Sequence, residues 1–249
     1  MRYFITFSYF GKSYHGWQNQ PNALTVQEVL ENAISKLLRS PISVVGAGRT
    51  DAGVHAREMF AHFDFKDSID SKDLVYRMNA FLPADIAVSQ IYLVNGEAHA
   101  RFDATERTYE YWITQKKNPF YFDRAHFVKN TLDVKAMNDA ANLFLGRKDF
   151  ECFSKSNTDV HTYLCDVRKT IWTEEEDKLV FTIVADRFLR NMVRAVVGTL
   201  IDVGTGKTSL ADIQRILESK DRTKAGASVP AKGLYLTKIE YPKTITKNE

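Results

Sequence analysis

The stretch Val44-Val-Gly-Ala-Gly-Arg-Thr-Asp-Ala-Gly-Val-His-Ala56 organises the first half of the chain. It leaves a β-branched pair and passes through glycines that bracket Arg49, Thr50 and Asp51. Because glycines permit a tight backbone that other groups can approach closely, the Asp51 carboxylate is predicted to lie on such a loop beside a guanidinium. Local composition leaves two interpretations open: a functional site, or a hairpin turn in which Asp51 hydrogen-bonds its own backbone. The glycine spacing matches neither a dinucleotide-binding fingerprint nor a phosphate-binding loop.

The segments on either side of this loop predict an α+β unit. In chain order they are a strand at 3–9, a helix at 26–38 that begins at the capping box Thr25-Val-Gln-Glu28, a short strand at 42–45, a strand at 57–65, a helix at 71–81 and a strand at 86–94. Asp51 is therefore expected between two strands. The order β-α-β-α-β with antiparallel pieces favours a ferredoxin-like arrangement.

The second half repeats these element types without detectable sequence repetition. Its predicted elements are a strand at 106–113, a helix at 133–145 ended by Gly146, a hairpin of strands at 163–172 and 179–188, a long helix at 189–203, a short helix at 209–218, a basic loop at 220–232 and a closing strand at 234–241. We therefore expect an α+β protein of two ferredoxin-like domains with mainly antiparallel sheets, packed side by side with an active-site cleft between them. Residues 1–104 would carry the Asp51 loop, and residues 105–249 would complete the cleft.

Composition and charge narrow the class of protein only modestly. The 249 residues carry a net charge of +3, a mild basic excess that permits a nucleic-acid partner without requiring one. The first residues alternate like a strand and lack a secretory signal, and no apolar run could cross a bilayer, so a cytoplasmic protein without a membrane partner is expected. Cys152 and Cys165 are too far apart for a redox pair and have no partners at metal-ligand spacing, which predicts reduced, half-buried thiols.

Two other patterns are set aside. The stretch Gly204-Thr-Gly-Lys-Thr208 resembles the end of a nucleotide-binding loop, but Ile201 replaces the required first glycine and a helix precedes it. The histidines show no metal-ligand geometry, because His55 and His62 span a strand rather than one helix face. Both are predicted to be structural, and no metal or other cofactor is expected.

Gly48-Arg-Thr-Asp-Ala-Gly-Val-His55 resembles the catalytic-aspartate motif of the TruA family of tRNA pseudouridine synthases. The segment Gly11–Pro21 is similar to the family's Tyr-x-Gly-x-x-Tyr-x-Gly-Trp-Gln-x-Gln motif, and the matches continue in the family's order to Gly233-Leu-Tyr-Leu236. One departure is Phe10, which stands where the family usually carries Asp before the glycine. Any role of that carboxylate is unfilled in this chain.

The resemblance implies that Asp51 is a nucleophile that attacks a uridine, at the base or at the ribose. The glycosidic bond to N1 then breaks and re-forms to C5, which needs no cofactor. By the same resemblance, Arg194 pairs with the aspartate, Arg49 contacts the RNA backbone, and Tyr109 stacks on the target base and helps to remove the C5 proton. From the residues alone, Arg194 could instead lie on a solvated helix face and Tyr109 could be an ordinary strand aromatic, as Tyr111 is expected to be.

Other positively charged residues are candidates for RNA contacts. Arg101 and Arg107 could each contact a phosphate or form a surface salt bridge. Residues that could line a surface along the RNA backbone are Lys12, Lys116, Lys117, Arg187, Arg190 and the loop 222–232.

The resemblance also implies the partner, a tRNA modified at positions 38 to 40 of its anticodon arm by a homodimer. Two other classes of function remain open. A non-catalytic RNA-binding or tRNA chaperone protein would not need Asp51. An aspartate-dependent nucleoside hydrolase would need a second carboxylate as acid, and none stands out in the matched motifs.

Overall fold

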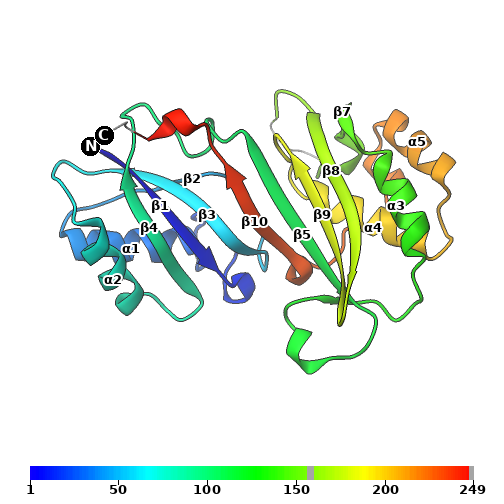
Figure 1. Cartoon of the computed structure of the whole chain (residues 1–249), viewed down its shortest axis with the longest axis horizontal. Helices are drawn as coiled ribbons and strands as arrows, with labels where there is room; N and C mark the ends of the chain where they lie inside the picture. Colours follow the sequence, from blue (N-terminus) through cyan, green and yellow to red (C-terminus); the bar gives the residue numbers. More distant parts are fainter. Residues whose placement is uncertain (156–159, 247–249) are drawn as a thin grey trace. The chain divides into compact units, whose positions relative to one another are not determined.

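The structure is a computed structural model that describes residues 1–155 and 160–246, and it divides into two compact units (Figure 1). The first unit is Met1–Thr105 together with the C-terminal segment that begins at Tyr235, and the second is Glu106–Leu234. Both units combine helices with mainly antiparallel strands, which agrees with the expected α+β class. None of the helices in residues 1–155 and 160–246 has the length and apolar content of a bilayer-spanning segment.

The strands of the first unit are arranged in the order β4-β1-β3-β10. Their bounds are Arg2–Tyr9 for β1, His55–Asp64 for β3, Ile86–Leu93 for β4 and Leu234–Glu240 for β10, and the short β2, Val45–Gly46, pairs with β3. Strand β1 is antiparallel to both of its neighbours, whereas β10 runs parallel to β3. The helices are α1, Val26–Leu38, and α2, Ser71–Phe81, and α2 packs on β4.

Local signals explain why α1 and α2 have the predicted bounds. The Thr25 side chain accepts a hydrogen bond from the backbone N–H of Glu28, and Asp70 caps α2 in the same way through the N–H groups of Lys72 and Asp73. The apolar positions of α1 that face the core are Val26, Leu30, Ala33 and Ile34. Capping and helical periodicity are both short-range, so the sequence predicts them well.

The strand predicted at 42–45 is found instead at Val45–Gly46. Side chains of α1 bind the backbone that was expected to pair: Ser35 Oγ accepts from the N–H of Ile42 at 2.9 Å, and Glu31 Oε1 accepts from the N–H of Val44 at 2.9 Å. These donors are therefore used by the helix, and pairing with β3 begins only at Val45.

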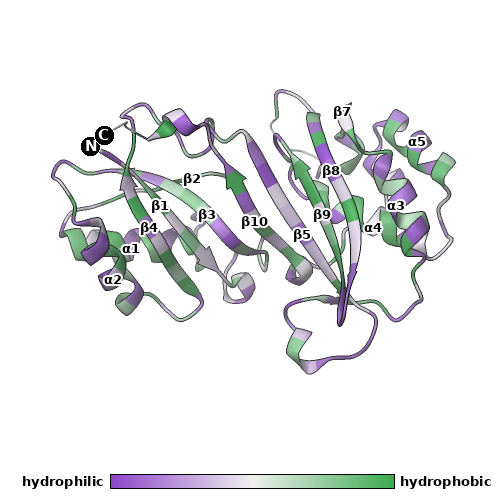
Figure 2. Ribbon diagram, viewed as in Figure 1, coloured by the Kyte–Doolittle hydropathy of each residue, from purple (hydrophilic) through white to green (hydrophobic). Residues whose placement is uncertain are grey.

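The strands of the second unit are arranged in the order β5-β9-β8-β7, with antiparallel pairing throughout. Their bounds are Glu106–Thr114 for β5, Gly146–Asp149 for β7, Leu164–Glu175 for β8 and Lys178–Ala185 for β9, and the short β6, His126–Phe127, runs parallel to β5. The helices are α3, Val134–Asn142, α4, Met192–Gly204, and α5, Leu210–Ser219. Figure 2 shows hydrophobic and hydrophilic positions alternating along α3 and α5, as expected for helices with one face on a core.

Three details of the second unit differ from the prediction. Helix α3 ends at Asn142 rather than at 145, and Gly146, with φ +89°, begins the unpredicted strand β7. The first hairpin strand is longer than predicted, since it continues to Glu175, which pairs with Lys178 across a two-residue turn, and the second is shorter, since it ends at Ala185. Cys152 and Cys165 are fully buried rather than half-buried, and burial raises the pKa of each thiol to about 12.

The closing strand was expected in the second domain, but it belongs to the first unit. Tyr235 and Leu236 of β10 pair with His55 and Ala56 of β3. The side chain of Glu58 on β3 also accepts a hydrogen bond from the N–H of Ile239 at 3.0 Å. The pairing is non-local, so neither propensity nor periodicity could assign this strand to its sheet.

Short 3₁₀ turns connect these elements. They are η1, Gly11–Ser13, η2, Pro119–Tyr121, η3, Glu151–Phe153, η4, Arg222–Lys224, η5, Ala231–Gly233, and η6, Lys243–Ile245.

Candidate active site

Asp51 is half-buried on the loop that joins β2 to β3. The loop leaves the sheet after Ala47, whose N–H donates to the carbonyl of Phe60 at 2.8 Å, and it closes where the N–H of Val54 donates to the carbonyl of Asp51 at 3.2 Å. Asp51 thus lies between two strands, as expected, and the paired strands on both sides restrict where its carboxylate can lie.

The loop between β1 and α1 holds the Asp51 loop at close range. Gly16 has φ +93°, and a Cβ added there would lie 2.4 Å from the carbonyl oxygen of Thr50. A Cβ at Gly46 would lie 2.5 Å from the ring of Trp17. Only glycine fits at these two positions, because each forms a close contact between the two loops.

Hydrogen bonds join the same two loops. The backbone N–H of Trp17 donates to the carbonyl of Thr50 at 3.2 Å, and the hydroxyls of Tyr9 and Thr50 share a hydrogen bond of 2.8 Å. The Trp17 ring is buried and stacks on Phe7 of β1 at 5.4 Å. Thr50, the residue before Asp51, is therefore held by Tyr9 of β1 and by Trp17 of the loop between β1 and α1. The sequence motifs do not reveal this connection.

Phe10, the departure from the family pattern, stacks on the ring of His55 with centroids 4.2 Å apart. His55 is buried, and its Nδ1 accepts a hydrogen bond from the N–H of Gly11 at 2.9 Å. Nearby, the Tyr14 hydroxyl donates to Asp85 at 2.6 Å, and burial together with this carboxylate raises the Tyr14 pKa. An aromatic stack thus occupies the position of the missing carboxylate.

Arg49 and Arg101, the other candidates in the first unit, are both exposed. Arg101 lies with its guanidinium carbon 5.6 Å from the centroid of the Phe102 ring. Nδ1 of His99 accepts from the N–H groups of Arg101 and Phe102 at 3.1 and 3.3 Å, so this turn is internally hydrogen-bonded.

In the second unit, Tyr109 and Arg107 lie on β5. Tyr109 is half-buried and meets Phe188 edge-to-face at 5.1 Å, whereas Tyr111 is fully buried and donates its hydroxyl to the carbonyl of Pro230 at 2.8 Å. Burial raises the Tyr111 pKa. Tyr111 is the core aromatic, as predicted, and Tyr109 retains partial exposure. Arg107 Nη1 donates to the carbonyl of Asp186 at 2.8 Å.

Arg194 lies in the first turns of α4 and is half-buried. Its Nε donates to the carbonyl of Val229 at 2.7 Å, and its own carbonyl accepts from the N–H of Val229 at 3.2 Å. Arg222 binds the same loop, with Nη2 donating to the Ser228 hydroxyl at 2.8 Å. The Arg194 side chain is therefore fixed by its hydrogen bond to Val229 and does not lie on a solvated helix face.

The candidates are divided between the two units. Asp51 and Arg49 share one loop of the first unit, and Arg101 lies elsewhere in the same unit. Tyr109, Arg107 and Arg194 belong to the second unit.

His62, predicted to be structural, accepts the N–H of Ala100 through Nδ1 at 3.1 Å. Its burial lowers the pKa to about 4, with the positive charge of Arg2 adding to the effect. Among the described residues, no group of three or more His, Cys, Asp or Glu side chains could hold a metal ion.

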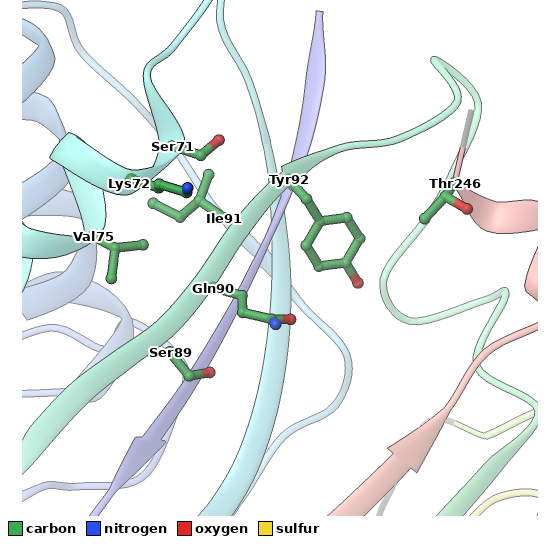
Figure 3. A pocket seen from close by; sticks show the side chains of 8 residues that line it. All are labelled: Ser71, Lys72, Val75, Ser89, Gln90, Ile91, Tyr92 and Thr246. Carbon is green, nitrogen blue, oxygen red and sulfur yellow. The ribbon is translucent and has the colours of Figure 1, made fainter. Parts of the chain in front are cut away.

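A groove of about 640 Å³ lies elsewhere in the first unit, between α2 and β4 (Figure 3). Its lining residues are Ser71, Lys72, Val75, Ser89, Gln90, Ile91, Tyr92 and Thr246. None of the candidate site residues lines it. The groove therefore contributes nothing to the assignment of an active site.

The fold and the glycine-bounded Asp51 loop agree with a comparison to known families. The family model described as tRNA pseudouridine synthase matches residues 5–103 and 140–242, and the chain belongs to that family, whose members are isomerases that act on tRNA. The match includes Arg49, Asp51, Arg101 and Arg194. Arg107 and Tyr109 lie between its two stretches.

Curated relatives extend the similarity to nearly the full length. A protein of Parabacteroides distasonis named tRNA pseudouridine synthase A is 51% identical over 247 residues, covering 98% of this chain and 97% of the relative. Proteins of the same name from Bacteroides thetaiotaomicron and Bacillus subtilis are 49% and 41% identical, over 100% and 97% of this chain and 93% and 99% of their own lengths.

Proposed function

We propose that this protein isomerises uridine to pseudouridine at positions 38, 39 and 40 in the anticodon stem-loop of tRNA, with Asp51 as the nucleophile. The observation that carries the proposal is the interlocked loop that presents Asp51 within the Gly-Arg-Thr-Asp motif. A hairpin turn stabilised only by its own hydrogen bonds would not need the close contacts that the loop between β1 and α1 makes with it at Gly16 and Gly46. The family to which the chain belongs supplies the reaction type.

The proposed chemistry uses only the side chains of the chain. The Asp51 carboxylate attacks the uridine, at the base or at the ribose, and the glycosidic bond to N1 breaks. The base turns and re-attaches through C5, the bond between Asp51 and the substrate breaks to free the carboxylate, the C5 proton leaves, and N1 gains a proton. Product and substrate have the same mass and oxidation state, so the step requires no electron acceptor.

Arg194, Tyr109 and Arg49 have supporting roles in the proposal. A carboxylate with reduced access to water tends to protonate, and the Arg194 guanidinium would keep Asp51 ionised. The hydrogen bond from Arg194 Nε to Val229 restricts the orientation of that guanidinium. Tyr109, which remains partly exposed beside Phe188, would stack on the extruded base, and the exposed Arg49 would contact the RNA backbone. Arg101 and Arg107 are proposed as further RNA contacts.

The proposal extends to a homodimer that works in the cytoplasm on the anticodon arm. If phosphate contacts position the RNA and the target base is extruded into the site, the enzyme would select its target more by the shape of the stem-loop than by its sequence.

Tritium release from tRNA labelled at C5 of uridine tests the reaction directly. Purified protein should release tritium from unmodified tRNA, only from the anticodon arm, and leave a product of unchanged mass. A nucleoside hydrolase would instead free uracil and leave an abasic ribose, and a binding protein would do neither. Folded protein that releases no tritium from any unmodified tRNA would refute the proposal.

A further inference from the structure

The loop that follows β5, residues 115–125, presents two large aromatic side chains to solvent (the green loop below β5 in Figure 1). Phe120 is 82% exposed and Phe122 is 70% exposed. Two neighbouring rings of this exposure on one short turn form an apolar patch, and such patches often mark a contact surface.

The turn that carries these rings is well ordered by its own hydrogen bonds. Asn118 Oδ1 accepts from the N–H of Phe120 at 3.0 Å, and Pro119 occupies the first position of the 3₁₀ turn. The carbonyl of Tyr121 accepts from the N–H groups of two later residues, each at 3.0 Å. A ligand that stacks on the rings would not have to order the loop first, which lowers the cost of binding.

Positive charge surrounds the two rings. Residues 115–130 contain Lys116, Lys117, Arg124 and Lys129 but a single acidic residue, Asp123. Lys116, Lys117 and Arg124 are exposed. Lys232 reaches the turn from η5: its Nζ donates to the carbonyl of Phe122 at 2.7 Å and lies 5.2 Å from the centre of that ring. Figure 2 shows the loop as mostly hydrophilic with a short hydrophobic stretch.

We propose that this aromatic–basic loop, residues 115–125 with Lys232, is a contact site for the tRNA substrate. Phe120 and Phe122 stack on unpaired bases, and Lys116 and Lys117 contact the adjacent phosphates. Exposed aromatic side chains within a positively charged surface bind nucleotides in this way. Every base can stack on an aromatic ring, and every phosphate in the backbone carries a negative charge. The inference rests on the proposed function in taking tRNA as the ligand.

A second copy of this chain is the competing occupant, and charge argues against it. In a dimer whose two-fold axis passes through this loop, Lys116, Lys117 and Arg124 would face the same charges of the second copy. A polyanion neutralises them instead. The loop also lies between the two stretches matched by the family model, so the match does not assign it a role.

Titration of unmodified tRNA tests the loop, with every variant built on Asp51→Asn so that no substrate turns over. Phe120→Ala and Phe122→Ala should each raise the Kd at least about fivefold without changing the salt dependence, since stacking is lost and phosphate contacts remain. Lys116→Ala combined with Lys117→Ala should lower the slope of log K against log salt by about 1 to 2. The matched control is Tyr76→Ala on α2, whose ring is 76% exposed and which should leave the Kd unchanged.

Three results would overturn the inference. They are an unchanged Kd for Phe120→Ala combined with Phe122→Ala, an equal loss of affinity with Tyr76→Ala, or conversion of a dimer to a monomer in sedimentation by that double substitution. Both rings are exposed, so each variant should unfold at the wild-type temperature, and the lysine pair provides a second readout. Tritium release by the wild type separates the two proposals. Release with an unchanged Kd refutes only the loop, and ring-dependent binding without release refutes only the proposed reaction.

Discussion

Replacing Gly16 with alanine should slow turnover strongly and lower the free energy of unfolding only modestly. The new Cβ would lie 2.4 Å from the carbonyl oxygen of Thr50, whereas ordinary contact begins near 3.4 Å, so the Asp51 loop must move by about 1 Å. A displacement of that size at a reacting group can cost about 100-fold in rate. The positive φ of Gly16 adds a strain of about 1–2 kcal/mol for any L side chain.

Gly146→Ala is the matched control for this substitution. Gly146 has φ +89°, close to the +93° of Gly16, but a Cβ there meets no atom within 4 Å. Both variants should therefore lose similar stability from strain, and only Gly16→Ala should suffer the contact with the loop.

Urea unfolding and single-turnover tritium release measure the two effects separately. We expect Gly16→Ala to be more than tenfold slower than Gly146→Ala under conditions where both are folded. A rate for Gly16→Ala within twofold of the control would show that contact between the two loops does not position Asp51.

Four further predictions concern single side chains. Asp51→Asn should abolish tritium release while tRNA binding stays near the wild-type level, because binding comes from dispersed phosphate contacts. Tyr109→Phe should keep base stacking and lose proton transfer, whereas Tyr109→Leu should lose both, as seen in rates with limiting and saturating tRNA. Arg194→Met should slow turnover by removing the cation proposed to keep Asp51 ionised, so that activity partly returns at higher pH. His62 should contribute a fall of about 2 kcal/mol to the free energy of unfolding between pH 7 and pH 5, which His62→Gln should lack, because only the unfolded chain binds the His62 proton in that range.

Each of these has a contrary outcome. Turnover of Asp51→Asn within tenfold of wild type would remove the nucleophile assignment, and wild-type rates for Tyr109→Leu would make that ring a packing residue. A pH profile of Arg194→Met identical to wild type would show that it does not pair with Asp51. For His62, the folded pKa lies below the unfolded value, so the stability is complete above about pH 6.5 and is lost toward pH 4. Equal pH dependence in His62→Gln would place the effect elsewhere.

The parts of the fold that the sequence predicts well depend on neighbours along the chain. Helices α1 and α2 have their predicted bounds because their N-caps directly precede them and their apolar faces lie within them. The strand at 42–45 was misplaced because Ser35 and Glu31 bind its backbone, and side-chain capture of this kind has no periodic signature. The closing strand was placed in the second domain for a related reason, since its pairing with β3 joins distant segments.

For the candidate site, the motif predicts the loop but not what holds it. Gly46 and Gly16 are recognisable as glycines in the sequence, yet the ring of Trp17 and the carbonyl of Thr50 that exclude a Cβ are visible only in three dimensions. Arg194 was expected to have an acidic partner, and the structure adds a hydrogen bond to the carbonyl of Val229 that no spacing rule predicts.

The pairing of β10 with β3 has a consequence for how the protein is made. His55, just after the Asp51 loop, pairs with Tyr235, and the whole of Glu106–Leu234 is synthesised between them. During translation, β3 therefore lacks one of its neighbours until β10 has left the ribosome. A nascent chain stalled before Tyr235 should carry every residue of the aspartate motif and still lack a complete sheet beneath it, so catalytic competence is expected only after β10 has been synthesised.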